Sequence, residues 1–286
     1  MKASHLASIL TICLIGFAPA ALVADDHGDG KPYLALGDSV TFGFMPQAGF
    51  EYVNASNFIG YPDYVGPAAR LAQVNAACPG ETSGSFLSAT APDRGCRAFR
   101  AQHLPLHVAY TGTQAEFASA FLQANPKTRL VTLQLGANDV FNLQQQCAGD
   151  FTCIVTGLPA TLAELEQNIL TAIAGMRAAG FRRTVVLLTY YPLDLNDPQT
   201  TAIIAVLNNA IIDAAARGGA MVADTFAPFA RASATLQAQG SPCKAGLLKA
   251  NPANPATCDV HPSQSGQRLI ADAVAAVLSK ALRSDD

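Results

Sequence analysis

The sequence contains few charged residues and no block of basic ones. Only 14% of its 286 residues are charged, and 18 Lys and Arg side chains are outnumbered by 21 Asp and Glu, for a formal net charge of −3. Binding to nucleic acid or to an anionic membrane surface needs a basic patch, so the composition argues against both. Half of the residues are hydrophobic, which is enough for a large core and argues against a disordered chain.

After its first two dozen residues, the chain has no apolar segment long enough to span a membrane. Residues 6–18 form a short, mostly apolar run between Lys2 and a stretch of small residues, which is the layout of a secretory signal peptide. We therefore predict a signal peptide over residues 1–24, with cleavage after Ala20 or Ala24 equally compatible with the sequence. Residues 25–286 are expected to form a single domain, a monomer that is secreted or periplasmic and has no stable membrane insertion.

The cysteines include no Cys-x-x-Cys pair, and histidines at ligand spacing are missing, so a zinc site is not predicted. Cys13 lies in the predicted signal peptide, and the remaining six cysteines are an even number in an exported chain, which implies disulfides. Six cysteines can pair in many ways, but each sequential pair brackets a turn-rich segment. We therefore expect the pairs Cys78–Cys96, Cys147–Cys153 and Cys243–Cys258.

No internal repeat or linker divides the mature chain. Short apolar runs bounded by turn residues recur along it and predict buried strands. These runs are residues 33–36, 73–76, 130–135, 185–188 and 220–223. Segments of helical periodicity lie between or after them, so the chain predicts an α/β domain with a parallel sheet.

Three of the expected helices have distinct sequence signals. One begins at Thr161 with a capping-box pattern and ends at Gly180, a second covers residues 200–217, and the last begins near Ser265. The segment 241–262 contains two Asn-Pro pairs and is expected to be an irregular loop tied by a disulfide.

Polar residues follow the expected strands, where a parallel sheet would gather them at one edge. Ser39 follows the first strand, Gly80 the second and Asn138 the third, and Asp259 and His261 come directly before the last helix. Catalysis by a serine nucleophile needs an exposed hydroxyl, a histidine base, a group that orients this base, and donors for the oxyanion. The sequence supplies a candidate for each of these roles.

These four blocks, in this order and spacing, resemble the SGNH (GDSL-type) hydrolases, a family of esterases and lipases. The resemblance runs from about Tyr33 to Leu282 and is greatest to secreted bacterial members with three sequential disulfides. It implies a flavodoxin-like three-layer α/β/α sandwich with a central parallel sheet. An α/β-hydrolase is excluded because the chain has no Gly-x-Ser-x-Gly elbow.

The resemblance also implies a role for each site residue. Ser39 would be the nucleophile and His261 the base, while the amides of Ser39 and Gly80 and the side chain of Asn138 would bind the oxyanion. No metal and no organic cofactor are implied. Asp38 and Asp139 are expected to anchor loops by accepting backbone N–H groups rather than to take part in the chemistry.

The chain departs from the family pattern at two positions. Val40 replaces the usual leucine, which we interpret as an exchange of buried apolar side chains. The family carries its aspartate three residues before the histidine, whereas position 258 is a cysteine here and Asp259 lies two residues before His261. The acceptor for the histidine is therefore either Asp259 or the backbone carbonyl of Cys258. We favour Asp259, because a carboxylate forms a charge-assisted hydrogen bond.

The sequence thus predicts a secreted serine esterase or lipase that hydrolyses small-molecule or lipid carboxylic esters through an acyl-enzyme on Ser39. The alternative is a non-catalytic, exported ligand-binding protein on the same fold. Acyl chains of short to medium length are expected, because no long apolar lid is evident. Residues that follow the fourth strand are candidates for the acyl pocket, namely Tyr190, Tyr191, Leu193 and Leu195. His103 and His107 are interpreted as structural or pocket-edge residues and not as metal ligands.

Overall fold

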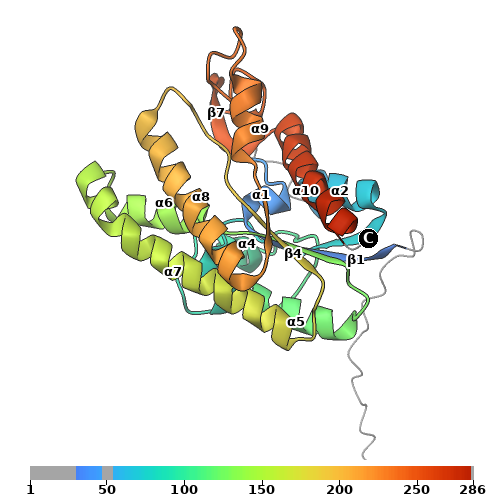
Figure 1. The fold of residues 1–286 in the computed structure, drawn as a ribbon. Helices are drawn as coiled ribbons and strands as arrows, with labels where there is room; N and C mark the ends of the chain where they lie inside the picture. The colour runs from blue at the N-terminus through green and yellow to red at the C-terminus, as the bar shows by residue number, and fades with distance from the viewer. Residues whose placement is uncertain (1–29, 47–53, 285–286) are drawn as a thin grey trace, which may run out of the picture.

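A five-stranded parallel sheet lies at the centre of the molecule (Figure 1). The structure is a computed structural model and describes residues 30–46 and 54–284. The strands are β1 (Lys31–Gly37), β2 (Leu71–Asn75), β3 (Leu130–Gln134), β4 (Thr184–Leu188) and β5 (Met221–Ala223). Their order is β2-β1-β3-β4-β5, and every neighbouring pair is parallel. The five apolar runs therefore correctly predicted the strands, to within two residues at each end.

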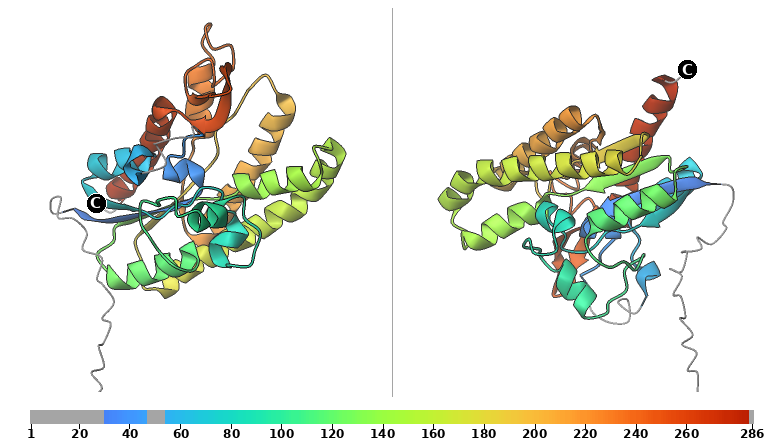
Figure 2. Two further views of the ribbon diagram at one scale, coloured as in Figure 1. Left: turned by 180° about the vertical axis from the view of Figure 1, so that it is seen from behind. Right: turned by 90° about the horizontal axis from the view of Figure 1, so that it is seen from below.

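Helices cover both faces of the sheet, as the views from behind and from below show (Figure 2). Helices α2 (Pro62–Ala69) and α10 (Gln264–Ser284) pack together on one face. Helices α5 (Gln114–Ala124), α7 (Phe151–Ala178) and α8 (Pro198–Gly218) cover the other. Strands buried on both faces have continuous apolar runs, and β3 is buried at all five positions. The predicted three-layer α/β/α sandwich is confirmed, and the strand order is the flavodoxin-like one.

Short helices lie near the edge where the strands end. They are α1 (Ser39–Phe42), α3 (Ser83–Leu87), α4 (Cys96–Ala101), α6 (Ala137–Gln146), α9 (Phe226–Ser233) and the 3-10 helix η2 (Ala55–Asn57). Helix α1 starts two residues after β1, and α6 starts three residues after β3. These short connections bring the first residues of both helices to the carboxyl end of the sheet.

The predicted start of the long helix α7 is wrong. The helix begins at Phe151 rather than at Thr161, because Asp150 caps it by accepting the N–H of Cys153 at 2.9 Å. Thr161 lies in the helix interior, where its hydroxyl donates to the carbonyl of Gly157. The capping-box pattern at Thr161 therefore lies inside a helix that begins earlier in the chain.

The expected irregular loop at residues 241–262 is also a wrong prediction. It contains a two-stranded antiparallel sheet of β6 (Leu248–Asn251) and β7 (Asn254–Pro262), with β-bulges between the paired positions. Asn251 pairs with Asn254, so the Asn-Pro pairs mark the tight turn of a hairpin. Four prolines and two asparagines interrupt the apolar residues of this segment, and this obscured the strands in the sequence.

The three disulfides have the expected pairing. Cys78–Cys96, Cys147–Cys153 and Cys243–Cys258 join Cα atoms that are 5.4, 5.6 and 5.6 Å apart. Among the described residues, no helix has both the length and the apolar character needed to cross a membrane. The predicted signal peptide, residues 1–24, lies outside the residues that the structure describes.

Candidate active site

Ser39 is the first residue of α1, directly beyond the carboxyl end of β1. The turn needs a glycine at position 37, which has a φ of +141° and where a Cβ atom would lie 2.4 Å from the carbonyl oxygen of Gln134. Asp38 caps the helix by accepting the N–H of Val40 at 2.9 Å, and it also accepts the hydroxyl of Tyr190 at 2.6 Å. Asp38 therefore anchors the loop, as predicted, and holds Ser39 in place.

His261 and Asp259 lie together at the end of β7, beside Ser39. The Nε2 atom of His261 is 2.9 Å from the hydroxyl oxygen of Ser39, and its Nδ1 atom contacts the Oδ1 atom of Asp259. The same carboxylate oxygen accepts the backbone N–H of His261 at 2.9 Å, so the Asp259 side chain folds back along its own strand. The structure thus brings the three residues into a continuous chain from carboxylate to hydroxyl.

The environment of Asp259 favours its charged form. Partial burial raises the pKa of this carboxyl, but the hydrogen bonds and charge of His261 outweigh the burial and place the pKa below its usual value. The ring of Phe44 packs on the imidazole with centroids 5.0 Å apart and so restricts its orientation. This arrangement can hold a neutral imidazole with Nε2 facing the serine and can stabilise the imidazolium once it forms.

Gly80 and Asn138, which were predicted to bind the oxyanion, face the same pocket as Ser39. Gly80 lies in a tight turn that the N–H of Glu81 closes onto the carbonyl of Cys78 at 3.2 Å. Pro79 at the second position and Gly80 at the third, with a φ of +82°, fit a type II turn. The Nδ2 atom of Asn138 donates one hydrogen to the carbonyl of Glu81 at 2.9 Å, and the amide carries a second hydrogen for a ligand.

Asp139 connects Asn138 to the helices around it. Its carboxylate accepts the backbone N–H of Ser83 at 3.0 Å and the hydroxyl of Ser83 at 2.6 Å, as expected for a loop anchor. Asn168 of α7 donates to the same hydroxyl at 3.0 Å. Burial raises the pKa of Asp139 to about 6, and it raises the pKa of Asp38 to about 6 as well.

The structure also places Val40, His107 and His103, which the sequence analysis singled out. Val40 is buried, with 5% of its surface exposed, which fits its interpretation as an apolar exchange. The Nε2 atom of His107 lies 3.0 Å from the carbonyl oxygen of Phe42, and the two rings pack at 4.7 Å, so His107 supports the segment after Ser39. His103 is exposed after the end of α4.

A pocket of about 470 Å³ opens over Ser39 and His261. Its walls are mostly apolar and come from α4, α6, α8 and the segment after β4. Aliphatic and aromatic side chains include Val140, Phe141, Ile203, Ile204 and Leu207. Tyr190, Tyr191 and Leu193 line the pocket as expected, whereas Leu195 is not part of the lining formed by the described residues. The Tyr191 hydroxyl also donates to the carbonyl of Val260 at 2.8 Å and so holds β7 against the pocket.

Glu81 and Gln114 are the buried polar residues at this site that the sequence analysis missed. Glu81 directly follows Gly80, and an acidic side chain in a segment of small and hydroxyl residues was a usable signal. Gln114 gives no such signal, because it reaches Gly37 and Glu81 from a helix far along the chain. Burial raises the pKa of Glu81 to about 7.

Cys78, Glu81 and Cys96 place possible metal-ligand atoms within 4.8 Å of one another. Both sulfurs belong to a disulfide, so neither is available as the thiolate that binds a metal. The group is therefore interpreted as structural.

A serine, a histidine and a carboxylate joined by hydrogen bonds at the carboxyl edge of a flavodoxin-like sheet define a serine hydrolase. The chain belongs to the GDSL-like lipase/acylhydrolase family, whose model matches residues 35–269. It is a hydrolase of carboxylic esters of the serine type.

Solved structures of esterases share this fold. The acetylxylan esterase Axe2 from Geobacillus stearothermophilus is 21% identical, with a TM-score of 0.53 over 86% of this chain and 93% of that one. A catalytic mutant of Axe2 is 20% identical, with a TM-score of 0.54 over the same shares. A candidate SGNH hydrolase from Slackia heliotrinireducens is 19% identical, with a TM-score of 0.50 over 87% of this chain and 100% of that one. A comparison with curated proteins finds no match.

Proposed function

We propose that this protein is an exported esterase that forms an acyl-enzyme on Ser39. The hydroxyl oxygen of Ser39 attacks the ester carbonyl while Nε2 of His261 takes the hydroxyl proton. Asp259 accepts a hydrogen bond from Nδ1–H of the same ring and stabilises the imidazolium. The tetrahedral oxyanion receives hydrogen bonds from the amides of Ser39 and Gly80 and from the free Nδ2–H of Asn138.

Collapse of the tetrahedral intermediate releases the alcohol. The imidazolium of His261 donates its proton to the leaving alkoxide oxygen, the bond between this oxygen and the carbonyl carbon breaks, and the acyl group stays on Ser39. A water molecule then gives a proton to His261 and attacks the acyl carbon, which returns the serine hydroxyl and releases the carboxylic acid. The side chains described above supply every proton transfer in both halves of the reaction.

The observation that carries this proposal is the 2.9 Å contact between Nε2 of His261 and the Ser39 hydroxyl at the base of an open pocket. A fluorophosphonate probe tests it, because such probes phosphonylate an activated serine. We expect labelling of the wild type, a mass shift on the peptide that contains Ser39, and no labelling of Ser39→Ala. Ser56→Ala is the matched control, since this exposed serine lies outside the pocket lining, and it should be labelled like the wild type.

The same experiment addresses the non-catalytic alternative. A folded wild-type protein that the probe does not label, and that releases no product from any ester, would support an exported ligand-binding protein. Labelling that persists in Ser39→Ala would assign the nucleophile to another residue.

The pocket supports a preference for short to medium acyl chains, such as butanoyl or hexanoyl, over the smaller acetyl group. A volume of about 470 Å³ with mostly apolar walls is larger than an acetyl group needs, whereas an acetylated sugar would require polar partners for its hydroxyls. Each methylene that enters the pocket gains about 0.8 kcal/mol, or roughly a fourfold rise in kcat/KM if the contact is made in the transition state.

Initial rates over a series of p-nitrophenyl esters test this preference. We expect kcat/KM to rise from acetyl to butanoyl or hexanoyl and to fall for palmitoyl. Ile204→Trp should narrow the pocket and remove the gain from longer chains, while the rate on acetyl ester stays similar. Val206→Trp is the control, because Val206 is 40% exposed on the same helix and outside the pocket lining. An optimum at palmitoyl, or the highest rate on acetylated xylan, would contradict the proposal.

Export is the remaining part of the proposal. It is supported by the predicted signal peptide and by three disulfides, which form and persist in oxidising compartments. Expression of the full chain in a bacterial host and N-terminal sequencing of the exported form should give a mature chain that starts at Ala21 or Asp25. Size-exclusion chromatography of that form should give the mass of a monomer.

A further inference from the structure

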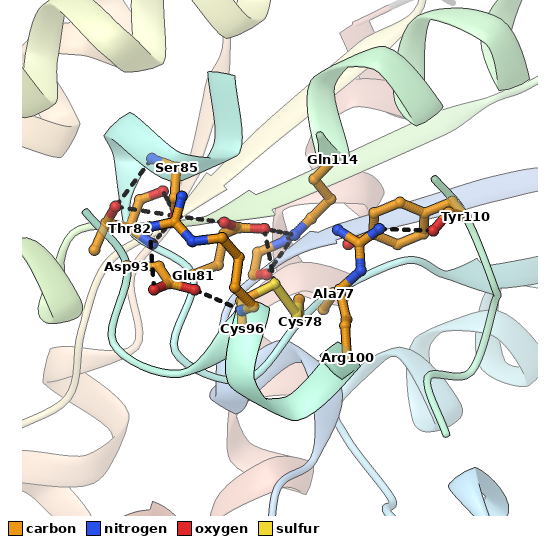
Figure 3. The surroundings of a disulfide bond; sticks show 12 residues. Ala77, Cys78, Glu81, Thr82, Ser85, Asp93, Cys96, Arg100, Tyr110 and Gln114 are labelled. Atoms are coloured by element: carbon orange, nitrogen blue, oxygen red, sulfur yellow. Dashed lines mark hydrogen bonds and ion pairs between the residues drawn. A yellow bond between two sulfur atoms is a disulfide. The ribbon is translucent and has the colours of Figure 1, made fainter. Parts of the chain in front are cut away.

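A buried carboxyl group lies directly behind the proposed oxyanion turn. Only 3% of Glu81 is exposed and it does not line the pocket; its carboxylate lies beside residues of α3, α4 and α5 (Figure 3). One carboxylate oxygen accepts the hydroxyl of Ser85, and the other accepts Nε2–H of Gln114 at 2.9 Å. Donors from two different helices therefore converge on this one side chain.

Gln114 extends this contact to the turn that carries the nucleophile. The residue is fully buried, and its side-chain amide forms a double hydrogen bond with the backbone of Gly37. Its oxygen accepts the N–H of Gly37 at 2.7 Å, and its nitrogen donates to the carbonyl of Gly37 at 3.0 Å. Gly37 is two residues before Ser39, so the Gln114 amide connects the nucleophile turn to Glu81.

The backbone of Glu81 holds both partners of the proposed oxyanion site. Its N–H closes the turn that presents Gly80, and its carbonyl accepts the Asn138 side chain at 2.9 Å. Movement of Glu81 would therefore displace two oxyanion donors at once.

We propose that Glu81 is a positioning residue that, through Gln114, fixes the distance between the nucleophile Ser39 and the oxyanion donors Gly80 and Asn138. The inference rests on the proposed function of these three residues. Glu81 does not touch the substrate in this proposal. It acts only by holding the two turns in register.

Among the residues that the structure describes, no cation forms an ion pair with Glu81, and the charge of Arg100 lowers the pKa of Glu81 by less than burial raises it. Arg100 is nearby, but its two terminal nitrogens donate to the carbonyls of Tyr110 and Gly112, and its guanidinium stacks on the Tyr110 ring at 4.7 Å (Figure 3). A buried carboxyl group held only by neutral donors is costly to fold, and such costs are typical of functional sites.

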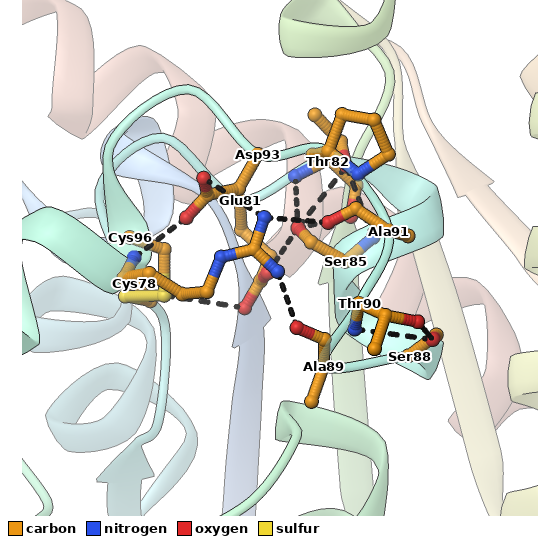
Figure 4. Close-up of polar contacts among 12 residues, drawn as sticks. Cys78, Glu81, Thr82, Ser85, Ser88, Ala89, Thr90, Ala91, Asp93 and Cys96 are labelled. Carbon is orange, nitrogen blue, oxygen red and sulfur yellow. Dashed lines mark hydrogen bonds and ion pairs between the residues drawn. A yellow bond between two sulfur atoms is a disulfide. The ribbon is translucent and has the colours of Figure 1, made fainter.

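The Cys78–Cys96 disulfide and the start of α3 also lie next to the carboxyl group. The sulfur of Cys96 lies 3.7 Å from the Glu81 carboxylate, and Cys78 is the first residue of the oxyanion turn (Figure 4). Ser85, which donates to Glu81, also accepts the N–H of Thr82 at 2.9 Å and so completes the cap of α3. Every contact of the Glu81 side chain thus leads to a segment next to the site.

Two substitutions at Glu81 test the proposal. Glu81→Ala removes both hydrogen bonds, and Glu81→Gln keeps them, because its oxygen can accept from Gln114 and its nitrogen can donate to Ser85. Oxyanion donors act mainly in the transition state, and a displacement of about 1 Å can cost on the order of a hundredfold in rate. We expect kcat of Glu81→Ala to fall about 10- to 100-fold with KM changed less than about threefold, and Glu81→Gln to restore kcat to within about threefold of wild type.

The rates are divided by the number of active sites that a fluorophosphonate probe titrates. Glu116→Ala is the matched control: Glu116 caps α5 two residues from Gln114, so this variant should lose thermal stability but keep its kcat. Gln114→Met is a second variant of similar size without the hydrogen bonds, and it should lose kcat like Glu81→Ala. If Glu81→Ala does not fold, the kcat of Gln114→Met tests the positioning role instead.

The outcomes separate this proposal from the one on which it rests. If folded Glu81→Ala or Gln114→Met keeps wild-type kcat per titrated site and loses only stability, Glu81 is structural and the proposal is overturned. If Glu81→Gln loses as much kcat as Glu81→Ala, the hydrogen-bonded geometry is not what matters, and the proposal is again overturned. Failure of the proposed function would appear instead as a wild type that is not labelled at Ser39.

Discussion

The orientation of His261 depends on a carboxylate only two residues before it. In an extended strand the side chains of positions 259 and 261 point to the same face, so Asp259 can reach the imidazole of its neighbour without a loop between them. The Oδ1 atom holds both the ring and the backbone N–H of His261, which limits its freedom. We expect Asp259→Asn to lower kcat by a factor on the order of 10⁴, the size known for the equivalent substitution in a serine protease.

The asparagine variant keeps the size and most of the geometry of the side chain, so its melting temperature controls for misfolding. Steady-state rates on a p-nitrophenyl ester, normalised to folded protein, measure the effect. A loss below about tenfold would show that another acceptor orients His261, and the carbonyl of Cys258 is then the candidate. The hypothesis of an Asp259 acceptor would have to be given up in that case.

At the scale of elements, the β6–β7 hairpin delivers His261 to a serine that lies 222 residues earlier in the chain. The Cys243–Cys258 disulfide fixes this hairpin to the segment before it and closes a separation of 15 residues, for a stabilisation of about 3 kcal/mol in the chain-entropy model. Replacing both cysteines by alanine should lower the free energy of unfolding by about 2–4 kcal/mol. It should also lower kcat, because Asp259 and His261 lose their rigid support.

The Cys147–Cys153 disulfide is the matched control for this element. It ties α6 to α7 across a separation of 6 residues and should contribute about 2 kcal/mol by the same model. Its double alanine variant should lose stability but keep kcat. Urea unfolding and initial rates on both variants give the comparison, and equal kcat values in the two would show that the hairpin does not need its disulfide for catalysis.

The elements differ in how well the sequence predicts them. The strands were predictable because a parallel sheet buried on both faces needs continuous apolar runs. The start of α7 was not, because the cap at Asp150 and the pattern at Thr161 are both locally valid signals and only packing selects between them. The hairpin was missed because short strands rich in polar and proline residues resemble a loop.

The site shows the same division. Ser39, Gly80, Asn138 and His261 could be located because they occupy strand ends that a parallel sheet must bring together. Glu81 had a local signal that the sequence analysis did not use. Gln114 could not be located, because its contacts depend on how α5 packs against the turn that carries Ser39, and no local pattern encodes that packing.

At the scale of the whole molecule, the strand order places the site at the switch point between β1 and β3, where an open α/β sheet leaves a crevice. Ser39 follows β1, Asn138 follows β3 and Gly80 lies in the turn after β2, so one edge of the sheet supplies the proposed nucleophile and the proposed oxyanion donors. The histidine comes from outside the sheet.

Three of these carboxyl groups make folding sensitive to pH. Burial raises the pKa of Glu81 to about 7 and those of Asp38 and Asp139 to about 6, so the folded protein retains protons that the unfolded chain releases at lower pH. The unfolded state then binds fewer protons, and the free energy of unfolding falls as the pH rises through this range. For Glu81 the fall begins above its unfolded pKa of 4.5 and levels off above about 7.

We therefore expect the wild type to be more stable at about pH 5 than at about pH 8, with Glu81 contributing about 2–3 kcal/mol of the difference. Urea unfolding followed by circular dichroism at several pH values measures it. Between about pH 6.5 and 8, Asp38 and Asp139 are mostly ionised, so the falling component of the slope belongs mainly to Glu81 and should be absent in Glu81→Gln. Burial lowers the pKa of Lys249 to about 8, so Lys249 adds a rising component near the upper end of this window, which both proteins share. The pKa of Asp259 is lowered, and its opposite effect falls at lower pH, outside this window. If Glu81→Gln and the wild type have the same slope there, Glu81 is already ionised in the folded protein below this pH range, and the expectation is wrong.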